Sequence, residues 1–226
     1  MVQLFVGLMA EGVTDYLFLK PVIEKALLDI SSKEIDKEVE ILVFEVKYQK
    51  DGGFHNHVFN ASKNGYEKYG IMSLVIHADA DDLNANKVYQ TKIQPAVNFI
   101  NRQEDVDLCK ELVAIVPVYE TESWMLANKE LIKKHIGTNK TDAQLNIDGH
   151  PESMRSPKEK IEEAIRIGRQ DLPRKIRDKV TINDLYSILG ESLDVRDIEN
   201  FTSYKDFVNN VKTMFKNLNL LKNKSL

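Results

Sequence analysis

The sequence contains very little cysteine: Cys109 is the single one among 226 residues. One cysteine excludes an internal disulfide and a zinc site built from several cysteines, and Cys109 itself is expected to be a buried residue near a helix end. Long apolar runs are also missing, since no stretch approaches the ~20 consecutive apolar residues of a membrane span. The first residues lack the basic region and the cleavage site of a signal peptide. These absences predict a cytoplasmic protein with no membrane partner.

Charge is unevenly distributed along a chain whose formal net charge is −4. Residues 1–150 carry an excess of acidic side chains, which favours a cation site, whereas residues 151–180 carry an excess of basic ones. The basic segment can face phosphates, or it can form a solvated helix face because acidic residues are interspersed in it. Its candidate contacts for a substrate phosphate are Lys158, Arg166 and Arg169. Binding to nucleic acid would then be local, because non-specific coating needs many phosphate contacts.

Apolar strands alternate with helices over the first 136 residues. Short apolar runs at 3–9, 39–46, 72–77 and 112–118 predict four buried strands. One expected helix begins near Thr14, and three more span residues 54–69, 84–101 and 120–135. This order predicts an α/β fold, a Rossmann-like parallel sheet covered by helices. We assign residues 1–136 to this domain.

The strand pattern stops near residue 136. Residues 137–157 are polar and rich in turn-forming residues, and the apolar periodicity beyond them predicts helices at 157–168, 181–189 and 203–218. We therefore expect residues 137–226 to form a small helical appendage that packs on the first domain.

Acidic residues follow three of the predicted strands. They are Glu11 after the first strand, Asp79 and Asp81 after the third, and Glu120 and Glu122 after the fourth. Open parallel sheets bind ligands at the carboxyl ends of strands, near the point where the strand order reverses. In the common order 2-1-3-4 the first and third strands are neighbours, so Glu11 would face the two aspartates. Because residues i and i+2 of an extended chain point the same way, both aspartates can serve one cation, and such hard oxygen ligands suit Mg²⁺ or Mn²⁺.

Other polar residues have competing interpretations. His55 and His57 can bind a transition metal, although no third ligand is evident and a structural role is favoured. His77 either contacts a phosphate or simply ends its strand. Asp15 and Asp82 are candidates for an outer shell around the cation, with helix capping and loop solvation as the favoured alternatives. No P-loop motif is present, so any ATPase would be a separate subunit.

Two motifs together resemble the Toprim domain family. Glu11-Gly12-Val13-Thr14-Asp15 precedes an amphipathic helix, and Val75-Ile76-His77-Ala78-Asp79-Ala80-Asp81-Asp82 follows later in the chain. The family includes the catalytic modules of topoisomerases and bacterial primases, the ribosomal-RNA maturation nucleases and the overcoming-lysogenization-defect nucleases. The resemblance covers roughly residues 3–135.

This resemblance implies roles for the acidic residues. Asp79 and Asp81 would be the metal-binding pair of the family, and Glu11 its glutamate, which acts either as a ligand or as a general acid/base. Glu122 is a further catalytic candidate, and the alternative is an acidic residue favoured by the dipole of a helix first turn. One or two Mg²⁺ or Mn²⁺ ions at such a centre can neutralise a phosphate and activate a water molecule.

A narrower resemblance spans nearly the whole chain. Pro117-Val118-Tyr119-Glu120-Thr121-Glu122-Ser123-Trp124-Met125-Leu126-Ala127 and the helix start at Pro157-Lys158 resemble segments of small, mostly uncharacterised bacterial Toprim-like proteins. These proteins are related to the overcoming-lysogenization-defect nucleases, and proteins of this kind resemble components of bacterial defence or toxin systems. The narrower resemblance supports the fold more than any one reaction.

The leading prediction is a divalent-metal-dependent nuclease that acts on DNA or RNA, as an effector of phage defence or of a toxin system. The alternatives are a non-catalytic metal- or partner-binding subunit of an ATPase-containing complex and a small-molecule phosphohydrolase. Topoisomerase activity is disfavoured because the chain lacks a large DNA gate, and primase activity because it lacks a zinc module. The sequence leaves open a homo-oligomer and an association with a separate ATPase subunit.

Overall fold

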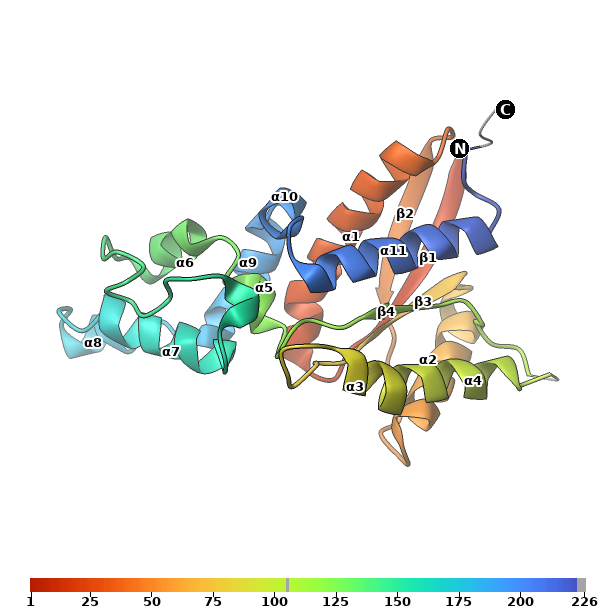
Figure 1. Cartoon of the computed structure of the whole chain (residues 1–226), viewed down its shortest axis with the longest axis horizontal. Coiled ribbons are helices and arrows are strands. Elements are labelled where there is room, and N and C mark those ends of the chain that lie inside the picture. Colours follow the sequence, from red (N-terminus) through yellow and green to blue (C-terminus); the bar gives the residue numbers. More distant parts are fainter. Residues whose placement is uncertain (105, 223–226) are drawn as a thin grey trace.

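The chain forms an α/β fold around one parallel sheet, as the strand pattern predicts (Figure 1). The computed structural model describes residues 1–104 and 106–222. Four parallel strands lie in the order β2-β1-β3-β4, which confirms a Rossmann-like α/β arrangement with the first and third strands as neighbours. The strands are β1 (Val2–Met9), β2 (Val39–Glu45), β3 (Ser73–His77) and β4 (Leu112–Ile115).

Helices connect the strands and continue after β4. Those between the strands are α1 (Val13–Glu34), α2 (Phe54–Tyr69), α3 (Asn86–Val88), a π-helical turn η1 (Tyr89–Ile93) and α4 (Gln94–Asn101). Those after β4 are α5 (Glu122–Met125), α6 (Lys129–Ile136), α7 (Pro157–Gly168), α8 (Arg174–Arg177), α9 (Leu185–Ser192), α10 (Val195–Ile198) and α11 (Thr202–Asn217), with short 3₁₀ turns η2 (Pro151–Ser153) and η3 (Ile182–Asp184). Among the described residues, every helix lacks the length or the apolar composition needed to cross a membrane.

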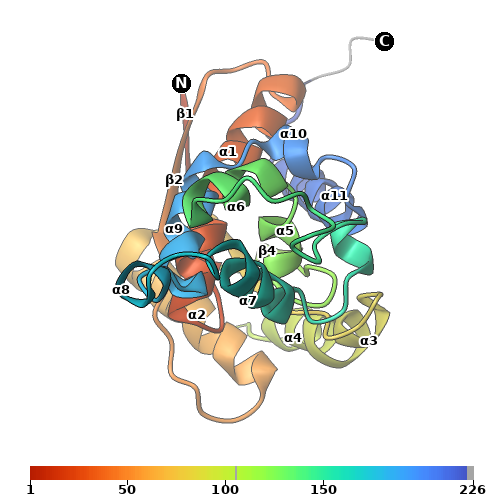
Figure 2. The same ribbon diagram turned by 90° about the vertical axis from the view of Figure 1, so that its left-hand side faces the viewer.

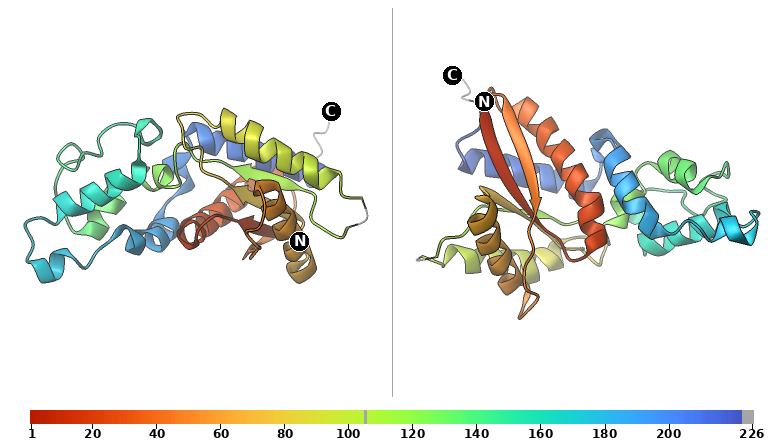
Figure 3. Two further views of the ribbon diagram at one scale, coloured as in Figure 1. Left: turned by 90° about the horizontal axis from the view of Figure 1, so that it is seen from below. Right: turned by 180° about the vertical axis from the view of Figure 1, so that it is seen from behind.

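The two faces of the sheet are covered by different helices. Alternate residues of β1 (Leu4, Val6 and Leu8) are fully buried in the core that α1 and α11 share. Residues Leu74 and Ile76 of β3 belong to a second core, beneath α2 and α4. Figure 3 shows α1 lying along β1 and β2 on one side, with α2 and α4 on the other. Burial on both faces accounts for the near-continuous apolar strands in the sequence.

Helices α5 to α10 form a group beyond the carboxyl ends of the strands, which faces the viewer in Figure 2. The chain then returns, and α11 packs against β4 and α1. Trp124 of α5 and Ile161 of α7 belong to the same hydrophobic core as Leu4 of β1. Residues on both sides of the predicted boundary at residue 136 thus share one core, and the boundary itself stays a prediction.

Local structure departs from the sequence prediction after β4. The strand ends at Ile115 rather than at residue 118, since Pro117 has no N–H to continue the ladder toward β3. Backbone contact nevertheless continues, because Ala80 donates to the Pro117 carbonyl at 3.1 Å. The helix expected at 120–135 is broken into α5 and α6, and the Asn128 side chain begins α6 by accepting from the Leu131 amide at 3.1 Å.

Helix α9 lies unusually close to the first half of α1. A side chain at Gly190 would place its Cβ 2.7 Å from the Phe18 carbonyl oxygen and 3.0 Å from that of Leu17. Lys25 of α1 strengthens the contact, because its ammonium donates to the carbonyls of Gly190 at 3.0 Å and Leu193 at 2.9 Å. The glycine therefore holds the helical group against α1.

We predict that Gly190→Ala destabilises the fold. Alanine is the better helix former by about 1 kcal/mol, but here the added methyl meets backbone atoms that cannot rotate away, and overpacking costs about 1–3 kcal/mol. Urea unfolding should show a lower free energy of unfolding for this variant. Ser187→Ala on the same helix is the control and should stay within about 0.5 kcal/mol of wild type. A stabilised Gly190→Ala protein would contradict the close contact.

Candidate active site

The turn after β1 presents Glu11 to solvent at the carboxyl end of the sheet. Asp15 reaches back to accept from the Gly12 amide at 2.9 Å, so its carboxylate caps the start of α1. Capping, the favoured interpretation of Asp15, is therefore what the structure shows. The Glu11 side chain remains about half exposed, at 49%, and its Oε1 lies 3.7 Å from the ammonium of Lys92.

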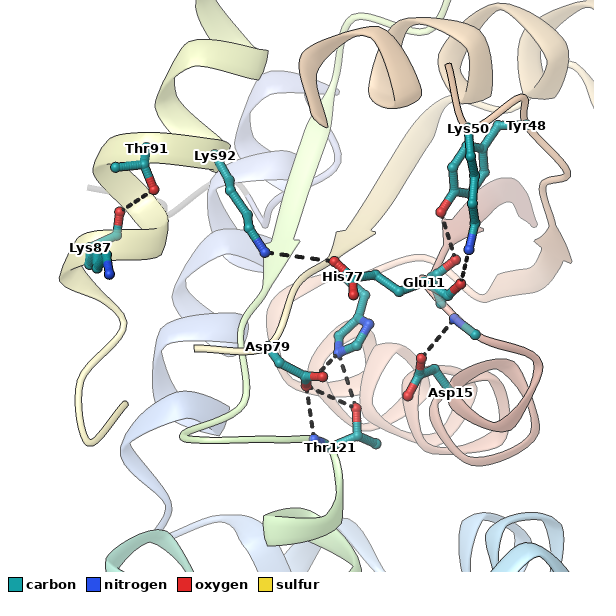
Figure 4. A network of polar contacts seen from close by, with 12 residues as sticks. Glu11, Asp15, Tyr48, Lys50, His77, Asp79, Lys87, Thr91, Lys92 and Thr121 are labelled. Carbon is teal, nitrogen blue, oxygen red and sulfur yellow. Dashed lines mark hydrogen bonds and ion pairs between the residues drawn. The ribbon is translucent and has the colours of Figure 1, made fainter. Parts of the chain in front are cut away.

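Asp79 is held firmly at the end of β3 (Figure 4). Its Oδ1 accepts from the Thr121 amide at 2.9 Å and lies 3.2 Å from Nε2 of His77. Thr121 Oγ1 lies 3.4 Å from the same oxygen. Among the described residues no hydrogen bond to the second oxygen, Oδ2, is found. One oxygen is thus fixed by the protein while the carboxylate stays partly exposed, which is how supporting contacts orient metal-ligating carboxylates.

His77 supports this carboxylate from the core. The ring is completely buried, and Nε2 also lies 3.0 Å from Thr121 Oγ1. Burial by itself lowers the pKa of His77, but the hydrogen bond to Asp79 and the charges of Asp79, Asp15 and Glu11 raise this pKa overall. His77 therefore neither reaches a phosphate nor merely ends its strand, because it braces Asp79 and lies within the electrostatic field of the Glu11 turn.

The loop after Asp79 does not continue as extended chain. Asp81 adopts a left-handed backbone conformation with φ 54° and is exposed. Its amide donates to the Tyr119 carbonyl at 2.9 Å, so the loop is tied to the segment after β4. Asp79 and Asp81 therefore do not lie two residues apart in extended chain, so their spacing does not make them point the same way. Asp82 accepts from the following amide, that of Leu83, at 2.6 Å and is solvated, as a loop residue is expected to be.

Two glutamates follow β4 in different environments. Glu120 accepts from the Lys158 amide at 3.4 Å, and burial raises its pKa, to which the charges of Asp79 and Asp81 add. Glu122 is 7% exposed and accepts a hydrogen bond from the Tyr186 hydroxyl of α9. Burial is also the largest cause that raises the pKa of Glu122. Both glutamates belong to the same acidic neighbourhood, but Glu122 is directed into the packed helical group.

The three basic candidates have different surroundings. Lys158 is exposed at the start of α7, beside Glu120, and so lies next to the acidic residues. Arg166 is exposed farther along α7, 3.7 Å from Glu163. Arg169 is buried, and its guanidinium donates to the backbone carbonyls of residues 136, 176 and 177. The prediction that Arg169 contacts a substrate phosphate does not agree with this burial, since its donors hold three chain segments together.

The remaining candidates have structural surroundings. The His55 ring packs against Phe99 at 5.0 Å and the His57 ring against Tyr48 at 5.6 Å, measured between ring centroids. Cys109 is buried, and burial raises the pKa of its thiol to about 12, which leaves it protonated at neutral pH and a poor nucleophile.

Sequence reasoning missed several polar residues around Glu11 and Asp79. Nothing in the sequence marks Thr121, because threonine is common and its partner, Asp79, lies 42 positions away. Lys50 donates to the Glu11 carbonyl, and Tyr48 donates to the Ala10 carbonyl at 3.0 Å. Lys92 approaches from the π-helical turn. Lys50 precedes the turn-forming Asp51-Gly52-Gly53, but nothing in the sequence marks Lys92.

The donor set fits a hard divalent cation only in part. Among residues 1–104 and 106–222, no three acidic, histidine or cysteine side chains already form a cluster that could enclose an ion. The available donors, on Glu11, Asp79 and Asp81, are carboxylate oxygens, and Asp79 keeps one of its two without a described hydrogen bond. Such a set suits Mg²⁺ or Mn²⁺ with water completing the shell. That the three carboxylates share a cation stays a prediction.

Comparison with known proteins yields no relative. No family model, no curated protein and no solved structure matches the chain. The function is therefore argued from the residues and their geometry.

We predict that Glu122→Gln changes the pH dependence of stability. Because the folded-state pKa of Glu122 is raised above its usual value of 4.5, folding favours the protonated form. The contribution of this group to the free energy of unfolding is therefore greatest below pH 4.5 and is lost as the pH rises through the folded-state pKa. A glutamine carries no charge, so the variant should gain stability relative to wild type between acidic and neutral pH.

Urea unfolding at several pH values between 4 and 7 measures this difference. Glu162→Gln, which removes an exposed carboxylate from the middle of α7, is the matched control and should show a flatter difference from wild type. An equally flat difference for Glu122→Gln would show that its burial has no effect on its protonation.

Proposed function

We propose that the chain is a divalent-metal-dependent nuclease of the Toprim type that hydrolyses phosphodiester bonds of DNA or RNA. The observation that carries the proposal is the neighbouring position of β1 and β3, with Glu11 and a braced Asp79 at their carboxyl ends. In open parallel sheets this edge is where ligands bind. The motifs at these two strand ends are the ones that resemble the Toprim family.

Glu11, Asp79 and Asp81 would hold Mg²⁺ or Mn²⁺, which supplies charge neutralisation of a phosphate and a water of lowered pKa. The chain itself orients Asp79 through His77 and the Thr121 amide. Glu11 acts as a ligand or as a general acid/base from its exposed turn. Glu122, whose pKa burial raises and whose carboxylate accepts from Tyr186, stays a second acid/base candidate.

The resemblance also suggests a cytoplasmic effector of phage defence or of a toxin system, with a separate ATPase as a partner. A homo-oligomer is compatible with the proposal. The same acidic site in a non-catalytic metal-binding subunit would bind the cation without cleavage, and in a small-molecule phosphohydrolase it would act on nucleotides but spare polymers. These alternatives are outcomes of the cleavage assay below.

We predict that Asp79→Ala combined with Asp81→Ala abolishes cleavage and Mn²⁺ binding. Removal of carboxylates that hold the ion should lower turnover of supercoiled DNA, linear DNA or transfer RNA by at least about 100-fold. Mn²⁺ should raise the melting temperature of wild type, because a ligand that binds only the folded state stabilises it by mass action, and should leave the double variant unchanged.

Asp82→Ala is the matched control, because Asp82 belongs to the same loop, is exposed, and its side chain hydrogen-bonds only the Leu83 amide among the described residues. It should keep both cleavage and the Mn²⁺ response. If the double variant still cleaves, or if it responds to Mn²⁺ as wild type does, Asp79 and Asp81 are not the metal site and the proposal fails.

A further inference from the structure

Two lysines from separate parts of the chain each reach Glu11, one at its backbone carbonyl and one at its carboxylate. Lys50 comes from the segment between β2 and α2, and Lys92 from the π-helical turn η1. Figure 4 shows both side chains extending toward Glu11, on the side away from Thr121. The two lysines are 42 positions apart in the sequence, so it is the fold that brings both of them to Glu11.

Lys92 has uncommitted hydrogen-bond donors. Its ammonium lies 3.7 Å from Glu11 Oε1, which is within ion-pair distance but beyond the 2.7–3.2 Å typical of a hydrogen bond. The Phe54 ring, whose centroid lies 6.0 Å away, offers only a weak cation–π contact. Among the described residues no hydrogen bond from this ammonium is found. The side chain is one-third exposed, at 33%, so its charge is accessible from solvent.

Lys50 is fixed more firmly. One of its N–H groups donates to the Glu11 carbonyl, and the neighbouring Tyr48 hydroxyl donates to the Ala10 carbonyl at 3.0 Å. These two bonds hold the segment after β2 against the turn after β1. An ammonium has three donors, so Lys50 keeps two of them for another acceptor.

The two lysines lie where negative charge is concentrated. Glu11 and Asp79 follow the neighbouring strands β1 and β3, so a phosphate that approaches this edge of the sheet meets negative charge from both strand ends. Surface ion pairs contribute little to the free energy of unfolding. Stabilisation of the fold is therefore a weak explanation for two lysines at this turn. A lysine ammonium is also a common point-charge ligand for phosphate.

We propose that Lys50 and Lys92 form an anion-binding site around Glu11 in which each lysine takes one backbone phosphate of the nucleic acid. This inference rests on the proposed function for the identity of its ligand, and it adds a binding site to the one expected at Lys158. Lys92 exchanges its ion pair with Glu11 for one phosphate. Lys50 keeps its bond to the Glu11 carbonyl and contacts a second phosphate with its remaining donors.

The test is binding of fluorescein-labelled oligothymidylate and oligouridylate to the full chain in EDTA, measured by fluorescence anisotropy over a range of KCl concentrations. Without divalent ions the oligonucleotide stays uncut. Lys92→Gln and Lys50→Gln should each weaken binding about tenfold at low salt, and each should reduce the slope of log affinity against log salt by about 0.7, the value for one single-strand phosphate contact. Lys92→Arg should retain the affinity. The difference between the two probes shows whether DNA or RNA is preferred.

Lys87→Gln is the matched control. Lys87 is exposed on α3, five positions before Lys92, and its substitution removes the same charge from the same stretch of helix. It should leave the affinity within about twofold and the salt slope unchanged. Equal losses for Lys87→Gln and Lys92→Gln would overturn the proposal, since they would reflect net charge alone. An unchanged affinity of Lys92→Gln, or no binding by wild type at low salt, would also overturn it.

A parallel measurement separates this inference from the proposed function. Cleavage in Mn²⁺ tests the nuclease, whereas binding in EDTA tests the lysines. A chain that never cleaves but loses oligonucleotide affinity only in Lys50→Gln and Lys92→Gln would refute the nuclease and uphold the phosphate site. A chain that cleaves, and that binds equally well without these lysines, would uphold the nuclease and refute the phosphate site.

Discussion

Parallel pairing of β1 with β3 runs from Val6 opposite Ser73 to Met9 opposite Ile76, and the candidate site depends on it. A shift of one residue would exchange the two faces of β1 and expose its alternate apolar side chains to the wrong core. Gly7 leaves room for the side chains packed over this pairing, because a Cβ there would lie 2.8 Å from Ile71 Cδ1 and 2.9 Å from Leu74 Cδ1. The position of the Glu11 turn relative to Asp79 is thus set by packing beneath the sheet.

The same pairing concentrates negative charge at one edge, and the chain compensates for it locally. Asp79 is stabilised by hydrogen bonds from His77 and Thr121, and Glu120 by the first turn of α7. Lysines approach from different segments, since Lys50 and Lys92 flank Glu11 while Lys158 lies beside Glu120. Lysines therefore lie both at Glu11 and at Glu120, which offsets part of the negative charge at this edge.

Periodicity is enough to predict the parallel sheet and the position of Glu11 and Asp79 at strand ends, because both follow from local sequence. The strand order was only supposed, from the common winding of such sheets. Contacts between distant residues were not predictable. Arg169 directly follows the helix predicted at 157–168 and looks like a surface residue, yet it is buried and donates to the carbonyls of residues 136, 176 and 177. The bracing of Asp79 by Thr121 depends on how β3 and β4 end side by side, and the left-handed backbone at Asp81 depends on its bond to Tyr119.

The π-helical turn at Tyr89–Ile93 also changes the phase of the helix that contains it. The Gln94 amide bonds to the Tyr89 carbonyl, five residues back, so the turn holds one residue more than an α-helical turn of the same height. Val88 before the turn and Ile93, Ala96 and Ile100 at its end and beyond it are all buried in one core. Deletion of a single residue would rotate the helix segment after the turn by about 100° relative to the segment before it. The apolar side chains of one segment would then leave that core. We therefore expect residues 86–101 to tolerate a substitution more readily than a change of length. The position of Lys92 beside Glu11 depends on the same fixed length.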